Sequence, residues 1–131
     1  MRLLIVRHAK AADGSPDELR PLTEAGREHA RSLGKQLAAD GVRPDAILTS
    51  PLLRARETAD EIGKGVGVAV EEDDRLAPGA EADDVRAAVE GRGEIVIVVG
   101  HQPDCGQVAA DLSGGPEPKF PPGGVFAVDL D

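Results

Sequence analysis

Short runs of apolar residues alternate along this chain with longer stretches whose apolar positions recur at helical spacing. The apolar runs have the length of buried β-strands and cover residues 3–6, 46–48, 66–70, 95–99 and 125–128. The stretches with helical spacing are 23–39, 51–63, 81–90 and 103–112. This alternation predicts an α/β fold with three layers, α/β/α, around a mostly parallel central sheet.

The ends of two predicted helices carry specific signals. Thr23 has the side chain of an N-cap, and Gly41 follows the last apolar position of the same stretch. Pro51 is expected at the first position of the next helix, where its missing N–H costs nothing. Residues 114–124, rich in Gly and Pro, are expected to form a surface loop. The chain of 131 residues has no internal repeat and is expected to be one domain, 1–131.

Two histidines follow two of the predicted strands directly. Arg7 and His8 come after the first apolar run, and Gly100 and His101 come after the fourth. In open α/β sheets, ligands bind at the carboxyl ends of the strands, where the loops form a crevice. We therefore expect both imidazoles to lie at one edge of the sheet.

A second arginine belongs to the same edge. Ser50 and Pro51 follow the second strand, and Arg54 lies one turn into the helix after them. Right-handed crossovers bring these strand ends together, so two imidazoles and two guanidiniums would share a site beside a helix N-terminus. Such a group of donors suits the anionic oxygens of a phosphoryl group.

Two histidines and a phosphate suggest a covalent reaction. A neutral His8 imidazole could attack phosphorus, while Arg7 and Arg54 stabilise the phosphoryl oxygens and keep the imidazole unprotonated. His101 would donate a hydrogen bond to the same oxygens, which requires protonation or the correct tautomer. This chemistry needs neither a metal nor another cofactor, and His8, His29 and His101 lack the spacing of a zinc site.

Composition excludes several other classes of function. The net charge of −9 and the absence of Trp and Tyr disfavour nucleic-acid binding. No apolar run approaches the length of about 20 residues that a membrane-spanning helix requires. Cys105 is the only cysteine, and the N-terminus has no signal-peptide pattern, so a cytoplasmic location is expected.

Four sequence blocks in this order resemble the histidine phosphatase superfamily, also called the phosphoglycerate mutase-like superfamily. They are Arg7-His8-Ala9-Lys10, the segment from Arg20-Pro21-Leu22-Thr23 to Gly26, the segment from Ser50-Pro51-Leu52-Leu53-Arg54 to Ala59, and Val99-Gly100-His101. The resemblance implies a phosphoglycerate mutase-like fold, with His8 as the phosphorylated nucleophile and Arg7, Arg54 and His101 completing the pocket. The short chain and the block from Asp17 to Thr23 are most similar to the small SixA-like phosphohistidine phosphatases. This similarity makes Arg20 a candidate for substrate binding at the rim.

The chain departs from the superfamily pattern in its proton donor. Gln102 follows His101 where acid phosphatases of this superfamily place a carboxylate, and too few residues separate Thr58 from Ile95 for a large cap. Asp17, Glu72 and Asp104 remain candidates for a general acid. A phosphohistidine leaves with little need for an acid, and an open site admits a protein side chain. The expected substrate is therefore a phosphohistidine on a phosphotransfer domain or phosphocarrier.

Two other functions remain open from the sequence. One is a small-molecule phosphomonoesterase that acts on a phosphorylated metabolite, such as a sugar phosphate or a nucleotide-derived phosphate. The other is a non-catalytic module that binds phosphate or a phosphoprotein. Structural roles are also open for single residues: Arg7 in a surface ion pair, His8 as a hydrogen-bonded loop residue, Arg54 paired with Glu57 or Thr58, and His101 as a hydrogen-bonded core residue.

Overall fold

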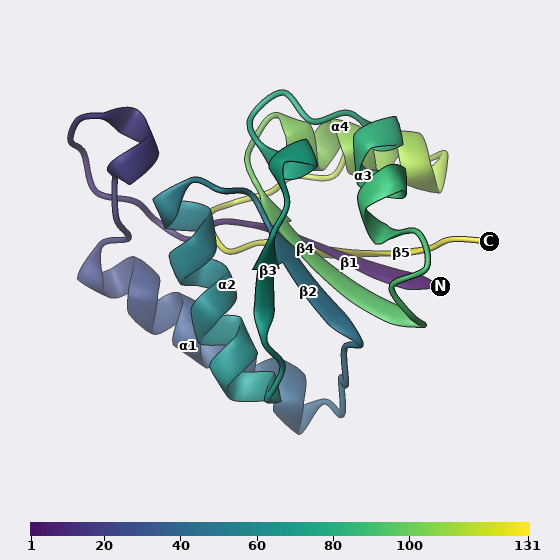
Figure 1. Ribbon diagram of the computed structural model, residues 1–131, viewed down its shortest axis with the longest axis horizontal. Coiled ribbons are helices and arrows are strands. Elements are labelled where there is room, and N and C mark those ends of the chain that lie inside the picture. The colour runs from purple at the N-terminus through teal and green to yellow at the C-terminus, as the bar shows by residue number, and fades with distance from the viewer.

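The computed structural model describes all 131 residues and contains a five-stranded sheet between two layers of helices (Figure 1). The sheet order is β3-β2-β4-β1-β5; β5 runs antiparallel to β1, and all other neighbouring strands are parallel. The strands are β1 Arg2–Arg7, β2 Ala46–Thr49, β3 Val70–Glu72, β4 Ile95–Gly100 and β5 Val125–Asp129. The helices are α1 Glu24–Ala39, α2 Leu53–Val66, α3 Ala82–Val89 and α4 Asp104–Ser113. The predicted three-layer α/β/α fold is confirmed.

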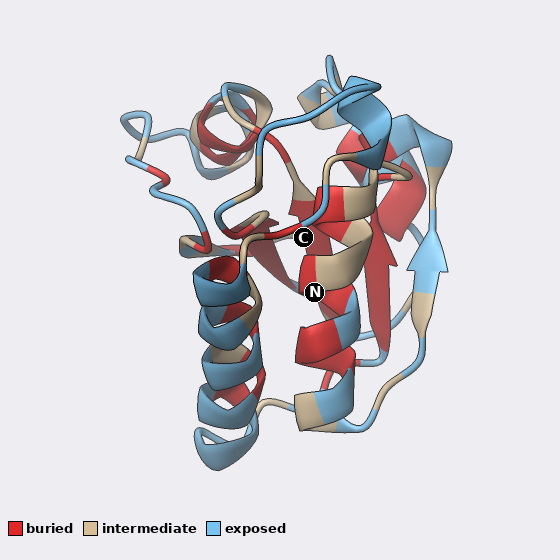
Figure 2. Ribbon diagram, turned by 90° about the vertical axis from the view of Figure 1, so that its left-hand side faces the viewer, coloured by how far each residue is buried: buried red, intermediate tan, exposed pale blue.

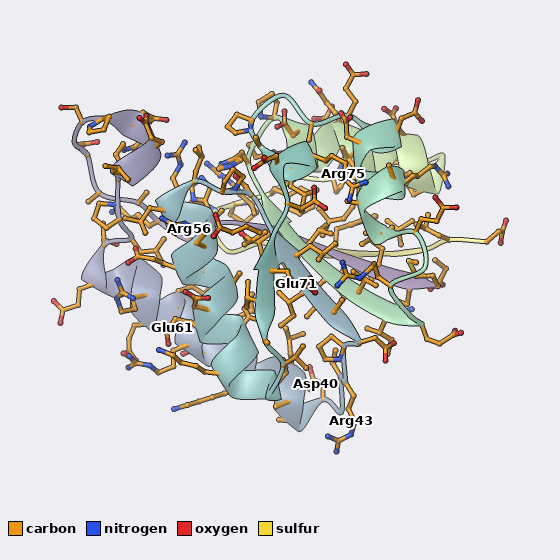
Figure 3. All side chains as sticks on the ribbon, viewed as in Figure 1. Asp40, Arg43, Arg56, Glu61, Glu71 and Arg75 are labelled. Atoms are coloured by element: carbon orange, nitrogen blue, oxygen red, sulfur yellow. The ribbon has the colours of Figure 1, made fainter.

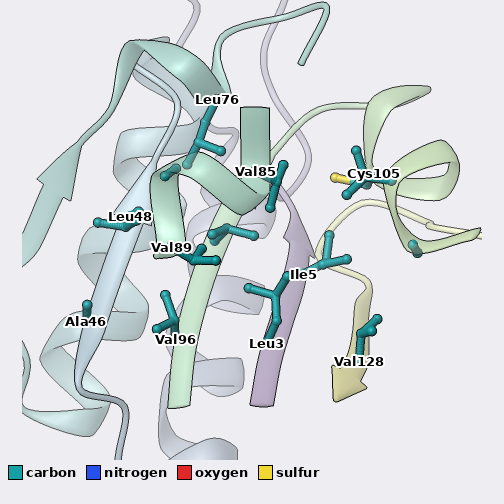
Figure 4. Packing of buried hydrophobic residues seen from close by; sticks show 14 of the residues in the cluster. Leu3, Ile5, Ala46, Leu48, Leu76, Val85, Val89, Val96, Cys105 and Val128 are labelled. Atoms are coloured by element: carbon teal, nitrogen blue, oxygen red, sulfur yellow. The ribbon is translucent and has the colours of Figure 1, made fainter. Parts of the chain in front are cut away.

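Alternating residues of the strands supply an aliphatic core on both faces of the sheet. Leu3 and Ile5 point toward α3 and α4, where they pack with buried side chains such as Val85 and Cys105 (Figure 4). Leu4 and Val6 belong to the other cluster, which α1 and α2 cover. Each fully buried aliphatic side chain contributes about 1.5–3 kcal/mol. The same alternation therefore fixes which side of β1 faces each helical layer.

Each helix presents one buried stripe to the sheet and an exposed face to solvent (Figure 2). In α1 the buried positions are Gly26, Ala30, Gly34 and Leu37, which recur at helical spacing. Thr23 caps this helix by accepting the Gly26 N–H at 2.9 Å, as predicted. The N-cap predicted from the sequence therefore stabilises the first turn of α1.

The boundaries of α2 and β3 differ from the prediction. Helix α2 begins at Leu53, because the Ser50 hydroxyl accepts the Leu52 N–H at 3.2 Å and holds Pro51 in the turn before the helix. The helix continues to Val66 and ends at Gly67, whose φ of 75° permits the left-handed conformation. The strand predicted at 66–70 is therefore wrong, and β3 begins only at Val70.

Two short 3₁₀ helices were not predicted: η1 Asp17–Leu19 and η2 Asp74–Leu76. The connection between α2 and β4 contains only β3, η2 and α3. The segment 114–124 is not wholly a surface loop, because its residue Phe120 is buried in the hydrophobic core. None of the helices is both long enough and apolar enough to cross a membrane.

Two glycines allow α1 and α2 to approach each other closely. A methyl group at Gly65 of α2 would overlap the backbone of Gly34 in α1, and one at Gly34 would lie 2.8 Å from the Glu61 carbonyl oxygen. Only glycine fits at either position without moving a helix backbone.

We therefore expect Gly65→Ala to lower the free energy of unfolding by about 1–3 kcal/mol, the usual cost of overpacking. The measurement is urea denaturation, with Gly115→Ala as the control, because a methyl group there meets only the Ser113 hydroxyl at 3.5 Å. Equal stability of the two variants would contradict the close packing of α1 against α2.

Candidate active site

The two histidines predicted to share a site lie side by side at the carboxyl edge of the sheet. Arg7 of β1 pairs with Gly100 of β4, and the His8 N–H donates to the Gly100 carbonyl at 3.0 Å. The imidazole rings of His8 and His101 have their centroids 5.3 Å apart, with an interplanar angle of 59°. Parallel pairing of adjacent strands thus brings together residues that are far apart in the sequence.

A backbone hydrogen bond defines the tautomer of His8. Its Nδ1 lies 2.7 Å from the Ala9 carbonyl oxygen, which can only accept a hydrogen bond, so Nδ1 carries the proton. Burial lowers the pKa of His8, and the charges of Arg54 and Arg7 lower it further, against the opposing effect of the Ala9 bond. At neutral pH the imidazole is therefore uncharged, and Nε2 has a free lone pair.

His101 is buried beside the Ser50 hydroxyl. Its Nε2 lies 2.7 Å from Ser50 Oγ, and its Nδ1 is buried without a hydrogen-bond partner in the protein. Ser50 Oγ already accepts the Leu52 N–H, so its own hydrogen is free to bond His101 Nε2. That arrangement leaves the proton on Nδ1 as an unused donor. Burial, followed by the charges of His8 and Arg54, lowers the pKa of His101 to about 4, so the ring is neutral in the free protein.

Arg7 is tied to the segment that precedes β5. One guanidinium nitrogen donates to the Phe120 carbonyl at 2.9 Å, while Nε is buried and has no partner. The Gly123 N–H lies 3.1 Å from both the Arg7 and His8 carbonyl oxygens, and Gly124 accepts the Arg7 N–H at 3.0 Å. These contacts anchor the end of the 114–124 segment beside the site. Arg7 therefore has backbone partners in place of the surface ion pair that was the alternative role.

Arg54 reaches the site from the first turn of α2, and its side chain is only 10% exposed. Its guanidinium donates to the Asp17 carbonyl at 2.9 Å and to the Asp17 carboxylate at 3.2 Å. Arg20 donates to the other carboxylate oxygen of Asp17 at 2.9 Å. The structure thus places Arg20 at the rim beside Arg54. The alternative partner, Glu57, instead pairs with Arg27 of α1.

Two hydroxyl side chains support the site, although neither was predicted to be a site residue. Ser50 contacts His101, as described above. Thr58, one turn beyond Arg54 in α2, donates to the Arg54 carbonyl at 2.8 Å and accepts the Ala9 N–H at 3.0 Å. Thr58 therefore links the loop after His8 to the helix that carries Arg54. The four-residue spacing of Arg54 and Thr58 was the available signal, because it places both residues on one face of the helix.

The three carboxylates considered as general acids have other partners. Arg20 and Arg54 hold the pKa of Asp17 below its ordinary value, so this side chain is ionised at neutral pH and is no proton donor. Asp104 accepts the Gly79 N–H at 2.8 Å, which ties it to the loop before α3. Glu72 is exposed on β3 and lies 3.9 Å from Arg56.

Other charged residues of α2 have structural partners. Arg56 and Glu61 project from α2 in Figure 3, and Glu61 lies on the side that faces α1. The buried Glu61 carboxylate is surrounded by Arg27, Arg31 and Lys64 at 3.3–3.8 Å. This cluster joins α1 to α2 away from the histidines. No group of three His, Cys, Asp or Glu side chains in the structure could hold a metal ion.

The site therefore combines a neutral imidazole that has a free lone pair with several buried donors. Arg7 Nε and His101 Nδ1 are two of the three buried side-chain atoms without a partner, and Arg54 adds a third group of donors. A buried donor without a partner costs about 1–3 kcal/mol, and an oxyanion would satisfy several of these donors at once. The arrangement suits in-line attack on a phosphoryl group.

Comparisons with known proteins identify the family to which the chain belongs. Residues 3–78 match the model of the histidine phosphatase superfamily, branch 1. The phosphohistidine phosphatase SixA of Escherichia coli K12 is 32% identical over the whole of this chain and 86% of its own length. A tungstate complex of the protein histidine phosphatase SixA superposes with a TM-score of 0.91 at 30% identity, covering 100% of this chain and 89% of the other. A SixA structure from Agrobacterium tumefaciens superposes with a TM-score of 0.85 at 28% identity, covering 99% of this chain and 91% of the other.

The fold and the site thus define a phosphatase of the phosphoglycerate mutase-like class. The chain belongs to the histidine phosphatase superfamily, and SixA proteins are among its relatives.

Thr58→Val removes the acceptor of the buried Ala9 N–H while it preserves the shape of the side chain. We expect it to lower the free energy of unfolding by about 1–3 kcal/mol, the cost of an unsatisfied buried donor. Urea denaturation measures the change, and Thr58→Ser, which keeps the hydroxyl, is the control. If Thr58→Val were as stable as Thr58→Ser, the hydrogen bond from the Ala9 N–H would not be the stabilising interaction.

The burial of neutral His101 predicts a pH dependence of stability. The unfolded chain protonates this residue near its ordinary pKa of 6.5, whereas the folded protein does so only near 4. Between these values the unfolded state binds more protons, so the free energy of unfolding decreases as pH falls from 6.5 toward 4. Urea denaturation across this range should show a shallower decrease for His101→Gln. An unchanged slope would contradict the burial of a neutral imidazole.

Proposed function

We propose that this protein is a metal-independent phosphohistidine phosphatase that forms a covalent phosphohistidine intermediate on His8. The observation that carries the proposal is the 2.7 Å contact of His8 Nδ1 with the Ala9 carbonyl. It leaves the lone pair of Nε2 free in a ring that lies beside His101 and near the charges of Arg54 and Arg7. In the first step, this lone pair attacks phosphorus in line with the departing group.

The donors have separate roles in this mechanism. Arg7 and Arg54 balance the charge of the phosphoryl oxygens during transfer, and His101 donates from Nδ1. The carbonyl of Ala9 stabilises the proton on Nδ1 of phosphorylated His8, which makes the ring a good leaving group in the second step. Water then attacks phosphorus, and His8 returns to the neutral tautomer that is present in the free protein.

Two observations support a phosphohistidine as the substrate. The ionised Asp17 and the bound Asp104 leave the site without an evident acid to protonate an alkoxide. An imidazole already protonated on its second nitrogen departs without such help. The relatives named SixA are phosphohistidine phosphatases, and one was solved with tungstate, a tetrahedral oxyanion like phosphate.

A protein partner suits the open edge of the sheet better than a metabolite does. Only β3, η2 and α3 lie between α2 and β4, so no inserted domain encloses a small molecule. The proposed substrate is a histidine of a phosphotransfer domain or phosphocarrier, which places the enzyme in cytoplasmic signal transduction. Membership of a phosphatase family argues against a module that only binds phosphate.

The test compares phosphate release from a phosphohistidine-bearing protein and from p-nitrophenyl phosphate, with EDTA present throughout. We expect kcat/KM to favour the phosphohistidine protein, EDTA to have no effect, and His8→Ala to abolish turnover on both substrates. A preference for the ester would instead support a small-molecule phosphomonoesterase. Absence of release from either substrate would contradict both enzymatic functions.

Arg54→Ala should weaken transition-state stabilisation by about 2.7–4 kcal/mol, the usual cost of losing one charged donor from such a site. The measurement is kcat/KM for the phosphohistidine protein. Arg56→Ala is the matched control, because Arg56 lies on the same helix and makes only a 3.9 Å ion pair with Glu72. Equal losses in the two variants would contradict a specific role for Arg54.

A further inference from the structure

Asp17 places a negative charge beside the cationic groups of the site. It begins η1, the 3₁₀ turn that was absent from the sequence prediction, and this turn lies against α2. One carboxylate oxygen contacts Arg54 and the other contacts Arg20. The Asp17 side chain is 62% exposed, whereas that of Arg54 is 10% exposed. The carboxylate therefore lies on the solvent side of the guanidinium, with lone pairs still free.

The exposed Asp17 carboxylate lies on the solvent side of Arg54, the side that is open to a leaving group. In an in-line transfer, the nucleophile and the leaving group occupy opposite sides of phosphorus. His8 is half-buried and attacks from the interior, so the leaving group faces solvent. An ester leaves as an anionic oxygen, which a nearby carboxylate disfavours. A phosphorylated imidazole with a proton on its second nitrogen carries positive charge on the ring, which the same carboxylate favours.

We propose that Asp17 selects N-phosphorylated imidazoles, by accepting a hydrogen bond from the second ring nitrogen of the substrate histidine. The proposal rests on the proposed function and assigns the residue that distinguishes phosphohistidine from phosphate esters. Asp17 then does for the substrate ring what the Ala9 carbonyl does for His8. Each acceptor holds a proton on the nitrogen that is not bonded to phosphorus. The two imidazoles that exchange the phosphoryl group would therefore have the same protonation state, with the proton on the nitrogen away from phosphorus.

The step balances without an additional proton donor. The lone pair of His8 Nε2 forms the new N–P bond, and the substrate N–P bond breaks with its electron pair remaining on the substrate nitrogen. The proton facing Asp17 stays on the substrate ring, which departs as a neutral imidazole. Asp17 remains a carboxylate throughout, in agreement with the lowering of its pKa by Arg20 and Arg54.

The test uses Asp17→Asn, which removes the charge but retains an amide oxygen and the main-chain carbonyl that bind Arg54. We expect kcat/KM for the phosphohistidine protein to fall about tenfold, the size of effect that one charge-assisted hydrogen bond supports. For p-nitrophenyl phosphate it should be unchanged or higher. Inhibition by inorganic phosphate should be equal or stronger, which shows that the pocket is intact.

Glu18→Gln is the matched control, because Glu18 is the next residue, is exposed and forms no ion pair. It should leave the ratio of the two activities unchanged. Equal loss of both activities in Asp17→Asn would overturn the proposal and make Asp17 only a support for Arg54. No loss of either activity would overturn it as well.

Failure of this inference is distinguishable from failure of the proposed function. The unmodified protein alone tests the function, through its preference for phosphohistidine over the ester. Only the change in that preference on Asp17→Asn tests the role of Asp17. A wild-type protein that prefers phosphohistidine, with an unchanged ratio in Asp17→Asn, would retain the function and overturn the inference.

Discussion

The parallel pairing of β1 with β4 is the constraint on which the site depends. Their register sets Arg7 opposite Gly100, and the next hydrogen bond, from His8 to Gly100, places the His8 and His101 rings 5.3 Å apart. Both strands are buried on two faces, so a slip of one residue would exchange the core contacts of every side chain. The packing of Leu3 and Ile5 against one helical layer, and of Leu4 and Val6 against the other, therefore also fixes the geometry of the histidines.

Neutral hydrogen bonds position most of the charged and nucleophilic groups. The Ala9 carbonyl orients His8, the Phe120 carbonyl orients Arg7, and the Ser50 hydroxyl contacts His101. These partners carry no net charge, so they leave the positive charge of the site available to a phosphoryl group. Arg54 is the exception, because it is paired with a carboxylate. A protein with a net charge of −9 thus retains a concentrated cationic site at one edge of its sheet.

The main residues of the site could be predicted from the sequence, but most of the contacts that support them could not. Apolar runs ending in His8 and His101 were sufficient to predict adjacent strand ends, because parallel strands share one carboxyl edge. The turn at Asp17 was not predicted, since it depends on Arg54, 37 residues away. The wrong strand at 66–70 has a similar origin, because its three valines pack against the same core from different elements. Val66 ends α2, Val68 lies in the connection after Gly67, and Val70 begins β3. Periodicity records which residues are buried, but tertiary contacts decide which element buries them.

The most direct test of the account is the position of the phosphoryl group on the trapped intermediate. Rapid quenching with a phosphohistidine-bearing protein, followed by peptide mapping and ³¹P NMR, would identify both the residue and the ring nitrogen. The account predicts acid-labile phosphate on His8 Nε2, because the Ala9 carbonyl occupies the Nδ1 side. Phosphate on His8 Nδ1 or on His101, or turnover without a phosphorylated enzyme, would contradict it.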